Sequence, residues 1–180
     1  MGRQQPNGHN RLLRPAWGRA LIGALAALGL AAAAAGGYAL LGHEAPDFAL
    51  HAAGGSNVRL SEHRGEVVVL SFWGSRCGPC RMQLATLDRS FKTYRSAGLQ
   101  VFGVNVDDDQ TVALESARTE RVGFPLLLDP RKAVAKSYLV DNLPMTILID
   151  RAGLVRQVHR DFDPKVEALY LQQLRTLLNE

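Results

Sequence analysis

The chain has 180 residues, which suits one domain of ordinary size with some additional chain. Its net charge of +4 comes from the first 43 residues, which hold four arginines and no acidic residue, whereas residues 44–180 hold 17 basic and 17 acidic residues. A nucleic-acid-binding face needs excess positive charge on the folded part, so this balance excludes nucleic acid as an expected partner. With two cysteines and five scattered histidines, the chain is not expected to hold a disulfide framework or a structural zinc site.

Residues 20–42 contain no charged residue and follow a basic segment, residues 1–19. A helix over these positions would be about 34 Å long, enough for a bilayer core of about 30 Å. The basic segment then stays in the cytoplasm, and residues 43–180 form a domain outside it. A cleaved signal peptide is the alternative, with small residues at 33–35 as its cleavage site. The apolar run continues through 38–41, so we expect an uncleaved membrane anchor over 20–42.

The domain begins with alternating apolar residues, which predict strands at 47–51 and 57–60 joined by a hairpin turn. An apolar run predicts a buried strand at 66–73, and an apolar stripe predicts a helix that ends near Gly98. The later predicted elements are a strand at 99–106, a helix at 109–120, a strand at 124–128, a helix at 130–138 capped by Asp129, strands at 145–149 and 154–159, and a helix that Asp163 and Pro164 open. This order predicts a three-layer α/β/α sandwich with a mixed sheet and an added N-terminal hairpin.

The two cysteines stand in the run Trp73-Gly-Ser-Arg-Cys-Gly-Pro-Cys80, between a predicted strand and a predicted helix. Cys77 therefore lies at the helix N-terminus, where free backbone N–H groups and the helix dipole stabilise a thiolate. Cys80 lies one turn further on and is more buried. The pattern predicts that Cys77 attacks a disulfide and that Cys80 resolves the mixed disulfide, with no cofactor besides this pair. Arg76 and Arg81 either favour the thiolate further or point into water.

These motifs resemble the thioredoxin superfamily, and within it the membrane-anchored, extracytoplasmic reductases of the TlpA/ResA type, over residues 44–180. The matching stretches are Ala45-Pro-Asp-Phe48, Leu60-Ser61, Arg64-Gly65, residues 67–73, Cys77-Gly-Pro-Cys80, and residues 143–150 followed by Gly153. The resemblance implies a thioredoxin fold in which a cis proline, Pro144, faces the cysteine pair, and an X-Pro bond is the one place where a cis peptide costs little. It also implies that a client contacts Trp73, Arg76, Gly78, Pro79 and Leu143.

Three positions depart from the pattern of that superfamily. Ser71 stands where thioredoxins commonly carry a buried aspartate. Asp108 matches an acidic residue that the anchored reductases often carry after the next strand, which implies a proton acceptor, and Asp107 is its rival. The acidic run 107–109 is otherwise only a solvated helix start. Arg76 replaces the aromatic or small residue that often precedes the first cysteine.

Together these features predict an oxidoreductase that reduces disulfides of client proteins, with its electrons restored by a membrane partner. The resemblance implies clients in cytochrome c or copper-site maturation. A peroxiredoxin-like peroxide reductase is one alternative, although the apolar run 72–74 lacks the Thr or Ser that such chemistry needs. The other is a redox-silent or Cu(I)-binding scaffold, with Met82 and Met145 near the two thiols, although packing is the favoured explanation of both methionines.

Overall fold

The computed structural model describes residues 36–163, 165 and 167–180. The predicted basic segment 1–19 and residues 20–35 of the predicted anchor lie outside the described residues. The last residues of that predicted anchor form a 3-10 helix, η2 (Gly36–Leu40), and the N–H of Gly42 then donates to the carbonyl oxygen of Val155 at 2.7 Å. Among the described helices, none has the length and apolar character needed to cross a membrane.

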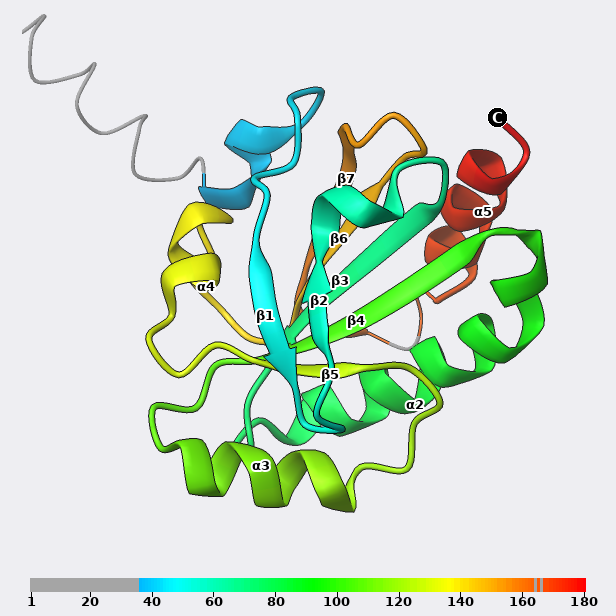
Figure 1. Ribbon diagram of the computed structural model, residues 1–180. Helices are drawn as coiled ribbons and strands as arrows, with labels where there is room; N and C mark the ends of the chain where they lie inside the picture. Colours follow the sequence, from blue (N-terminus) through cyan, green and yellow to red (C-terminus); the bar gives the residue numbers. More distant parts are fainter. Residues whose placement is uncertain (1–35, 164, 166) are drawn as a thin grey trace, which may run out of the picture. The chain divides into compact units, whose positions relative to one another are not determined.

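The described residues form a seven-stranded mixed sheet whose strands follow the predicted order along the chain (Figure 1). The strands are β1 (Ala49–Ala52), β2 (Asn57–Arg59), β3 (Val67–Trp73), β4 (Leu99–Asn105), β5 (Leu126–Leu128), β6 (Met145–Ile149) and β7 (Val155–Arg160). In space they lie in the order β2-β1-β5-β4-β3-β6-β7. The β3–β4 and β4–β5 pairs are parallel and the other pairs are antiparallel, so the mixed sheet and the N-terminal hairpin are confirmed.

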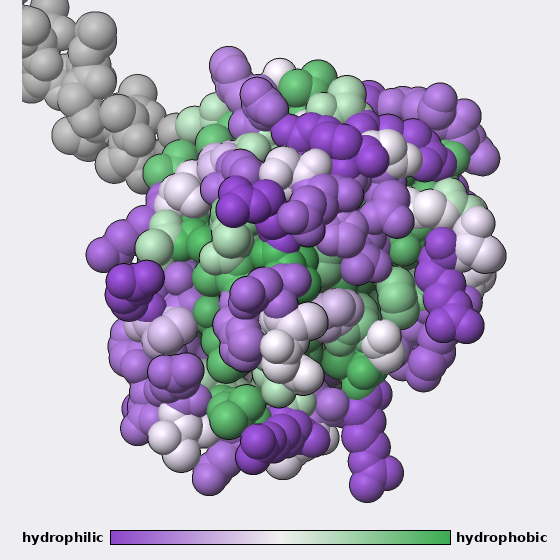
Figure 2. All heavy atoms as spheres, in the orientation of Figure 1, coloured by the Kyte–Doolittle hydropathy of each residue, from purple (hydrophilic) through white to green (hydrophobic). Residues whose placement is uncertain are grey.

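Helices cover both faces of this sheet (Figure 1). They are α2 (Gly78–Tyr94), α3 (Gln110–Thr119), α4 (Ala133–Ser137) and α5 (Glu167–Leu178), with short 3-10 helices η3 (Leu60–His63) and η4 (Arg95–Ala97). One core cluster joins α2, α3 and α5 to the sheet, and a second joins α4 and the segment before β1 to the opposite face. Every residue of β3 is buried, as expected for a central strand between two helical layers. Figure 2 shows a surface that is largely polar, with apolar side chains visible between the polar ones.

The fourth helix starts later than its sequence predicts. Asp129 and the following proline predict a helix from residue 130, but α4 begins at Ala133, after Lys132 adopts a left-handed conformation with φ 53°. The carboxylate of Asp129 still caps this helix, because it accepts the N–H groups of Ala133 at 2.9 Å and Ala135 at 2.8 Å. Capping therefore acts across a turn of three residues instead of directly at the helix start.

The segment before β1 is fastened to the domain by the motif residues that carry the resemblance. The carboxylate of Asp47 accepts the N–H of Ser61 at 2.9 Å and its hydroxyl at 3.0 Å. The Tyr138 hydroxyl donates to the carbonyl oxygen of Pro46 at 2.7 Å, and burial raises the pKa of Tyr138. These contacts explain why Ala45-Pro-Asp-Phe48 and Leu60-Ser61 occur together: each holds the other against the sheet.

Candidate active site

The cysteine pair lies where the central strand β3 passes into α2. After Trp73 the chain turns through residues 74–77, and the N–H of Cys77 donates to the carbonyl oxygen of Gly74 at 3.1 Å. Cys77 is the N-cap of α2, and Pro79 lies in the first turn of that helix. Cys77 and Cys80 are joined in a disulfide with their Cα atoms 5.3 Å apart. The strand, the turn and the helix therefore place both sulfurs at the N-terminus of α2.

The two sulfurs differ in exposure. Cys77 is half-buried, whereas Cys80 is 0% exposed and packs in the core cluster of α2 with Trp73 and Leu84. An incoming sulfur can therefore approach Cys77 but not Cys80. Since the first N–H groups of a helix have no partner within that helix, reduced Cys77 at the N-cap has donors nearby that stabilise its thiolate. This difference in exposure fits the predicted roles, in which Cys77 attacks and Cys80 resolves.

A groove of about 510 Å³ opens beside Cys77, between the loops that follow β3 and β4. Two residues expected to contact a client, Arg76 and Leu143, line this groove, and Gly78 and Pro79 are exposed beside it at the start of α2. Trp73 is different, because it is 1% exposed and packs behind the pair in the core. The expected client contact at Trp73 is therefore corrected to a packing role.

The peptide bond between Leu143 and Pro144 is cis, as the resemblance implies. Pro144 is buried and comes directly before β6, which pairs antiparallel with β3. The loop before β6 comes close to the turn that carries Cys77: a Cβ on Gly74 would lie 3.4 Å from Cδ1 of Leu143. Gly74 thus gives the two loops room to touch beside the cysteine pair.

The adjacent aspartates after β4 make different contacts. Asp108 is 81% exposed and pairs with the ammonium of Lys132 at 2.8 Å. The carboxylate of Asp107 accepts hydrogen bonds from the backbone N–H and the hydroxyl of Ser75, in the turn before Cys77. Both aspartates line the groove, but Asp107 is the one that contacts this turn. Arg81, whose charge could have favoured the thiolate, instead pairs with Glu120 at 3.3 Å.

A buried polar network that the sequence reasoning missed lies one turn further along α2. The Ser71 hydroxyl donates to Oε1 of Gln83 at 3.2 Å, and Nε2 of Gln83 donates to the hydroxyl of Thr146. Ser71 and Thr146 are 0% exposed and face each other in the β3–β6 register. The signal for this network was present as two hydroxyl residues within apolar strands and a glutamine three positions after Cys80. Ser71, which stands where a buried aspartate is common in thioredoxins, is therefore a neutral member of a hydrogen-bonded network.

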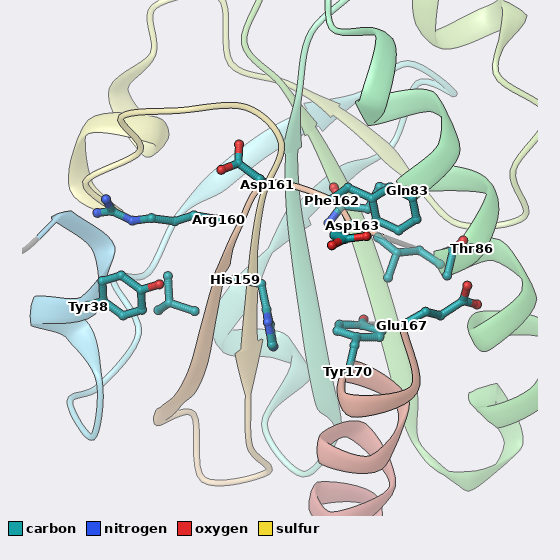
Figure 3. A pocket seen from close by; sticks show the side chains of 12 residues that line it. Tyr38, Gln83, Thr86, His159, Arg160, Asp161, Phe162, Asp163, Glu167 and Tyr170 are labelled. Atoms are coloured by element: carbon teal, nitrogen blue, oxygen red, sulfur yellow. The ribbon is translucent and has the colours of Figure 1, made fainter. Parts of the chain in front are cut away.

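A second cavity, of about 300 Å³, lies between α2, β7 and the start of α5 (Figure 3). Gln83 and Thr86 of α2 line one side, and the rings of His159 and Tyr170 pack together on the other, with centroids 5.6 Å apart. Burial lowers the pKa of His159 and so favours its neutral ring. Neither cysteine lines this cavity, which makes it distinct from the groove beside Cys77.

The methionines named as possible copper ligands lie apart. Met82 is 52% exposed on α2, whereas Met145 is fully buried in the core cluster on the opposite face of the sheet from Cys80. Within the described part of the chain, no group of three or more His, Cys, Asp or Glu side chains is placed to hold a metal ion. The position of Met145 fits a packing role.

Comparison with known proteins places these features in a family. The model of the AhpC/TSA family matches residues 41–158, which include both cysteines. The thiol-disulfide oxidoreductase ResA of Geobacillus kaustophilus is 35% identical over 118 residues, which are 66% of this chain and 68% of that protein. A solved structure from Chlorobium tepidum, assigned as the thiol:disulfide interchange protein DsbE, has 36% identity and a TM-score of 0.73, covering 77% of this chain and 97% of its own. The exposed lipoprotein thioredoxin of Streptococcus pneumoniae has 26% identity and a TM-score of 0.66, covering 73% of this chain and 100% of its own. The thioredoxin-like α/β fold is thereby confirmed.

Proposed function

Because this chain belongs to the AhpC/TSA family and is a thiol-disulfide oxidoreductase with a ResA-like cysteine pair, we propose that it reduces disulfides of client proteins outside the cytoplasm. The observation that carries the proposal is the asymmetry of the pair: half-buried Cys77 at the N-terminus of α2, and Cys80 with no exposed surface behind it. A centre of this kind takes up one client sulfur at a time and keeps the second thiol ready inside the protein.

The proposed reaction passes two electrons to the client. The thiolate of reduced Cys77 attacks one sulfur of the client disulfide, so that bond breaks and the leaving client sulfur takes a proton from solvent. The thiolate of Cys80 then attacks the Cys77 sulfur of the mixed disulfide and releases the second client thiol. The protein is left with the disulfide seen in this structure. A membrane electron donor must reduce that disulfide before the next cycle.

The proposed location rests on residues 1–42. Arginines followed by the uncharged run 20–42 support an anchor that leaves the domain on the extracytoplasmic side, and a cleaved signal peptide would give the same compartment. A relative described as an exposed lipoprotein thioredoxin supports such a location. We propose the periplasmic face of the inner membrane, with clients in cytochrome c or copper-site maturation.

The direction of electron flow is tested by the reduction potential of the full chain, equilibrated with thiol–disulfide buffers of known potential. A reductase is expected near the thioredoxin value of about −270 mV, and a value near the strongly oxidising limit of about −120 mV would refute the reductase role. The reduced protein should also reduce a protein disulfide, and Cys77→Ser should abolish that reduction.

The peroxide-reductase alternative has weaker support from the site. Phe72 and Trp73 are buried strand residues, and the hydroxyl of Ser75 is bonded to the carboxylate of Asp107 at 3.1 Å. A hydroxyl held in this way is not directed at a peroxide on Cys77. We expect the reduced protein to consume hydrogen peroxide no faster than an ordinary thiol does.

A further inference from the structure

The carboxyl ends of two parallel strands meet next to Cys77. Trp73 at the end of β3 pairs in register with Asn105 at the end of β4, and the N–H of Val106 donates to the carbonyl oxygen of Trp73 at 2.9 Å. Loops that leave the same edge of a parallel sheet lie side by side. The loop after β4 is therefore built against the turn that carries Cys77, and Asp107 is the residue of that loop that reaches it.

The carboxylate of Asp107 gathers hydrogen bonds from both loops. The N–H of Ser75 lies 2.9 Å from Oδ2 and 3.2 Å from Oδ1, and the Ser75 hydroxyl donates to Oδ1 at 3.1 Å. Behind it, Nδ2 of Asn105 donates to Oδ2 at 2.9 Å, and the N–H of Asp107 donates back to the side chain of Asn105 at 3.0 Å. Asn105 is 0% exposed. Because charge-assisted hydrogen bonds are about twice as strong as neutral ones, this carboxylate is a firm link between β4 and Ser75.

Gly74 is confined between two side chains. A Cβ at this residue would lie 3.3 Å from Oδ1 of Asp107 and 3.4 Å from Cδ1 of Leu143. The N–H of Cys77 in turn donates to the carbonyl oxygen of Gly74 at 3.1 Å. The carboxylate of Asp107 is thus linked to Cys77 through the backbone of Gly74 and Ser75.

We propose that Asp107 is a positioning residue that holds the turn 74–77 in place and sets a fixed negative charge beside Cys77. This role differs from that of a proton acceptor, because the carboxylate acts through its hydrogen bonds to Ser75 and through its charge, and carries no proton of the reaction. Its charge opposes the thiolate that the helix N-terminus favours, so Asp107 limits how much thiolate reduced Cys77 forms. The consequence for client reduction rests on the proposed function, whereas the effect on the Cys77 thiol does not.

The two roles of Asp107, position and charge, are separated by two substitutions. In full-length Cys80→Ser, Cys77 is the sole thiol, so the rate of its alkylation by iodoacetamide against pH reports its thiolate. Asp107→Asn keeps an oxygen that accepts the Ser75 N–H but loses the charge, and should move the midpoint of this profile about half a pH unit lower. With Cys80 restored, the same variant should reduce a disulfide client within about threefold of the parent rate, whereas Asp107→Ala should lose about tenfold or more.

Two further variants keep the test sharp. Ser75→Ala removes the hydroxyl bond and keeps the backbone one, so its client reduction rate should fall between those of Asp107→Asn and Asp107→Ala. Asp108→Asn makes the same charge change in the same groove, at an exposed residue already paired with Lys132, and should shift the alkylation midpoint less than Asp107→Asn does. If a thermal melt shows that Asp107→Ala does not fold, Asp107→Asn and Ser75→Ala still test the positioning role.

Three results would overturn the proposal. The first is Asp107→Ala with the alkylation profile and client reduction rate of the parent. The second is Asp107→Asn as slow in client reduction as Asp107→Ala, which would make the carboxylate a proton carrier. The third is a larger midpoint shift for Asp108→Asn than for Asp107→Asn. A parent protein that fails to reduce any disulfide refutes the proposed function instead, because the alkylation profiles stay measurable.

Discussion

Gln83 connects the active-site helix to two strands of the core. Its amide accepts the hydroxyl of Ser71 in β3 and donates to the hydroxyl of Thr146 in β6, one helical turn after Cys80. A buried polar group that loses its partner costs more than a hydrogen bond normally contributes, because the remaining groups have been taken out of water without compensation. The network therefore stabilises the packing of α2 on the sheet behind the cysteine pair.

Replacing Gln83 by leucine leaves both hydroxyls without their shared partner. The free energy of unfolding of the oxidised protein should fall by about 1–3 kcal/mol, measured by urea denaturation. Gln172→Leu, at an exposed position of α5, is the matched control and should change it by less than about 0.5 kcal/mol. Equal stability of the two variants would show that the network contributes nothing.

For single residues, the sequence predicts which side chains carry the chemistry better than it predicts which side chains they contact. The predicted roles of Cys77 and Cys80 follow from a strand, a two-residue spacer and a helix, all of which are visible in the sequence. The choice between Asp107 and Asp108 depends on which way the backbone turns after β4, and adjacent acidic residues give no sign of that direction. Gln83 was missed because a glutamine in an amphipathic helix has the same pattern whether it faces the core or solvent.

The helix α4 is capped by an aspartate that lies before the turn preceding the helix. Asp129 is 2% exposed and binds two N–H groups in the first turn of α4, although the helix starts at Ala133. Unbroken apolar runs predicted the central strands correctly, because a strand buried on both faces needs apolar residues at successive positions. The predicted start of α4 was wrong, because an Asp-Pro pair looks the same whether its cap is adjacent to the helix or separated from it. Here the cap is separated from α4 by a turn that includes Lys132 in a left-handed conformation.

Removing this cap tests its contribution. Asp129→Ala should lower the free energy of unfolding by about 1–2 kcal/mol, since two N–H groups at the start of α4 lose their acceptor. Asp129→Asn keeps one acceptor oxygen and should recover part of the loss. Urea denaturation of the three proteins decides, and an alanine variant as stable as the parent would contradict the capping role.

For the whole molecule, buried ionisable groups make stability depend on pH. Burial lowers the pKa of His159. The unfolded chain therefore binds a proton at this histidine at a higher pH than the folded protein does. The contribution of neutral His159 is fully present above the unfolded pKa of about 6.5 and is lost as the pH falls toward the folded value. Burial also acts to raise the pKa of Asp88, but hydrogen bonds from Lys92 and Gly123 lower it overall, which adds a second loss below about pH 4.

Substituting His159 by phenylalanine should isolate the first of these effects. The variant keeps an aromatic ring against Tyr170 and removes the titrating group. Between pH 7 and pH 5 the free energy of unfolding of the parent should fall more steeply than that of His159→Phe, as measured by urea denaturation at each pH. Parallel curves for the two proteins would contradict the assignment.

The layered fold was predictable from the alternation of strands and helices, but the junction between the predicted anchor and the domain was not. Apolar residues run without a break through 38–41, yet Gly36–Leu40 forms η2, and the Tyr38 ring lies 4.9 Å from the guanidinium of Arg160 in β7. An apolar sequence has the same character in a bilayer and against a protein surface, so nothing in it marks this boundary. The anchor over 20–42 stays a prediction.

The central claim is that Cys77 attacks and Cys80 resolves. The most direct measurement is the fraction of each single-cysteine variant trapped as a mixed disulfide with an oxidised client, determined by mass spectrometry of the non-reduced complex. Cys80→Ser should accumulate a mixed disulfide through Cys77, while Cys77→Ser should trap almost none, because Cys80 is 0% exposed. Trapping by Cys77→Ser in the absence of trapping by Cys80→Ser would contradict the account.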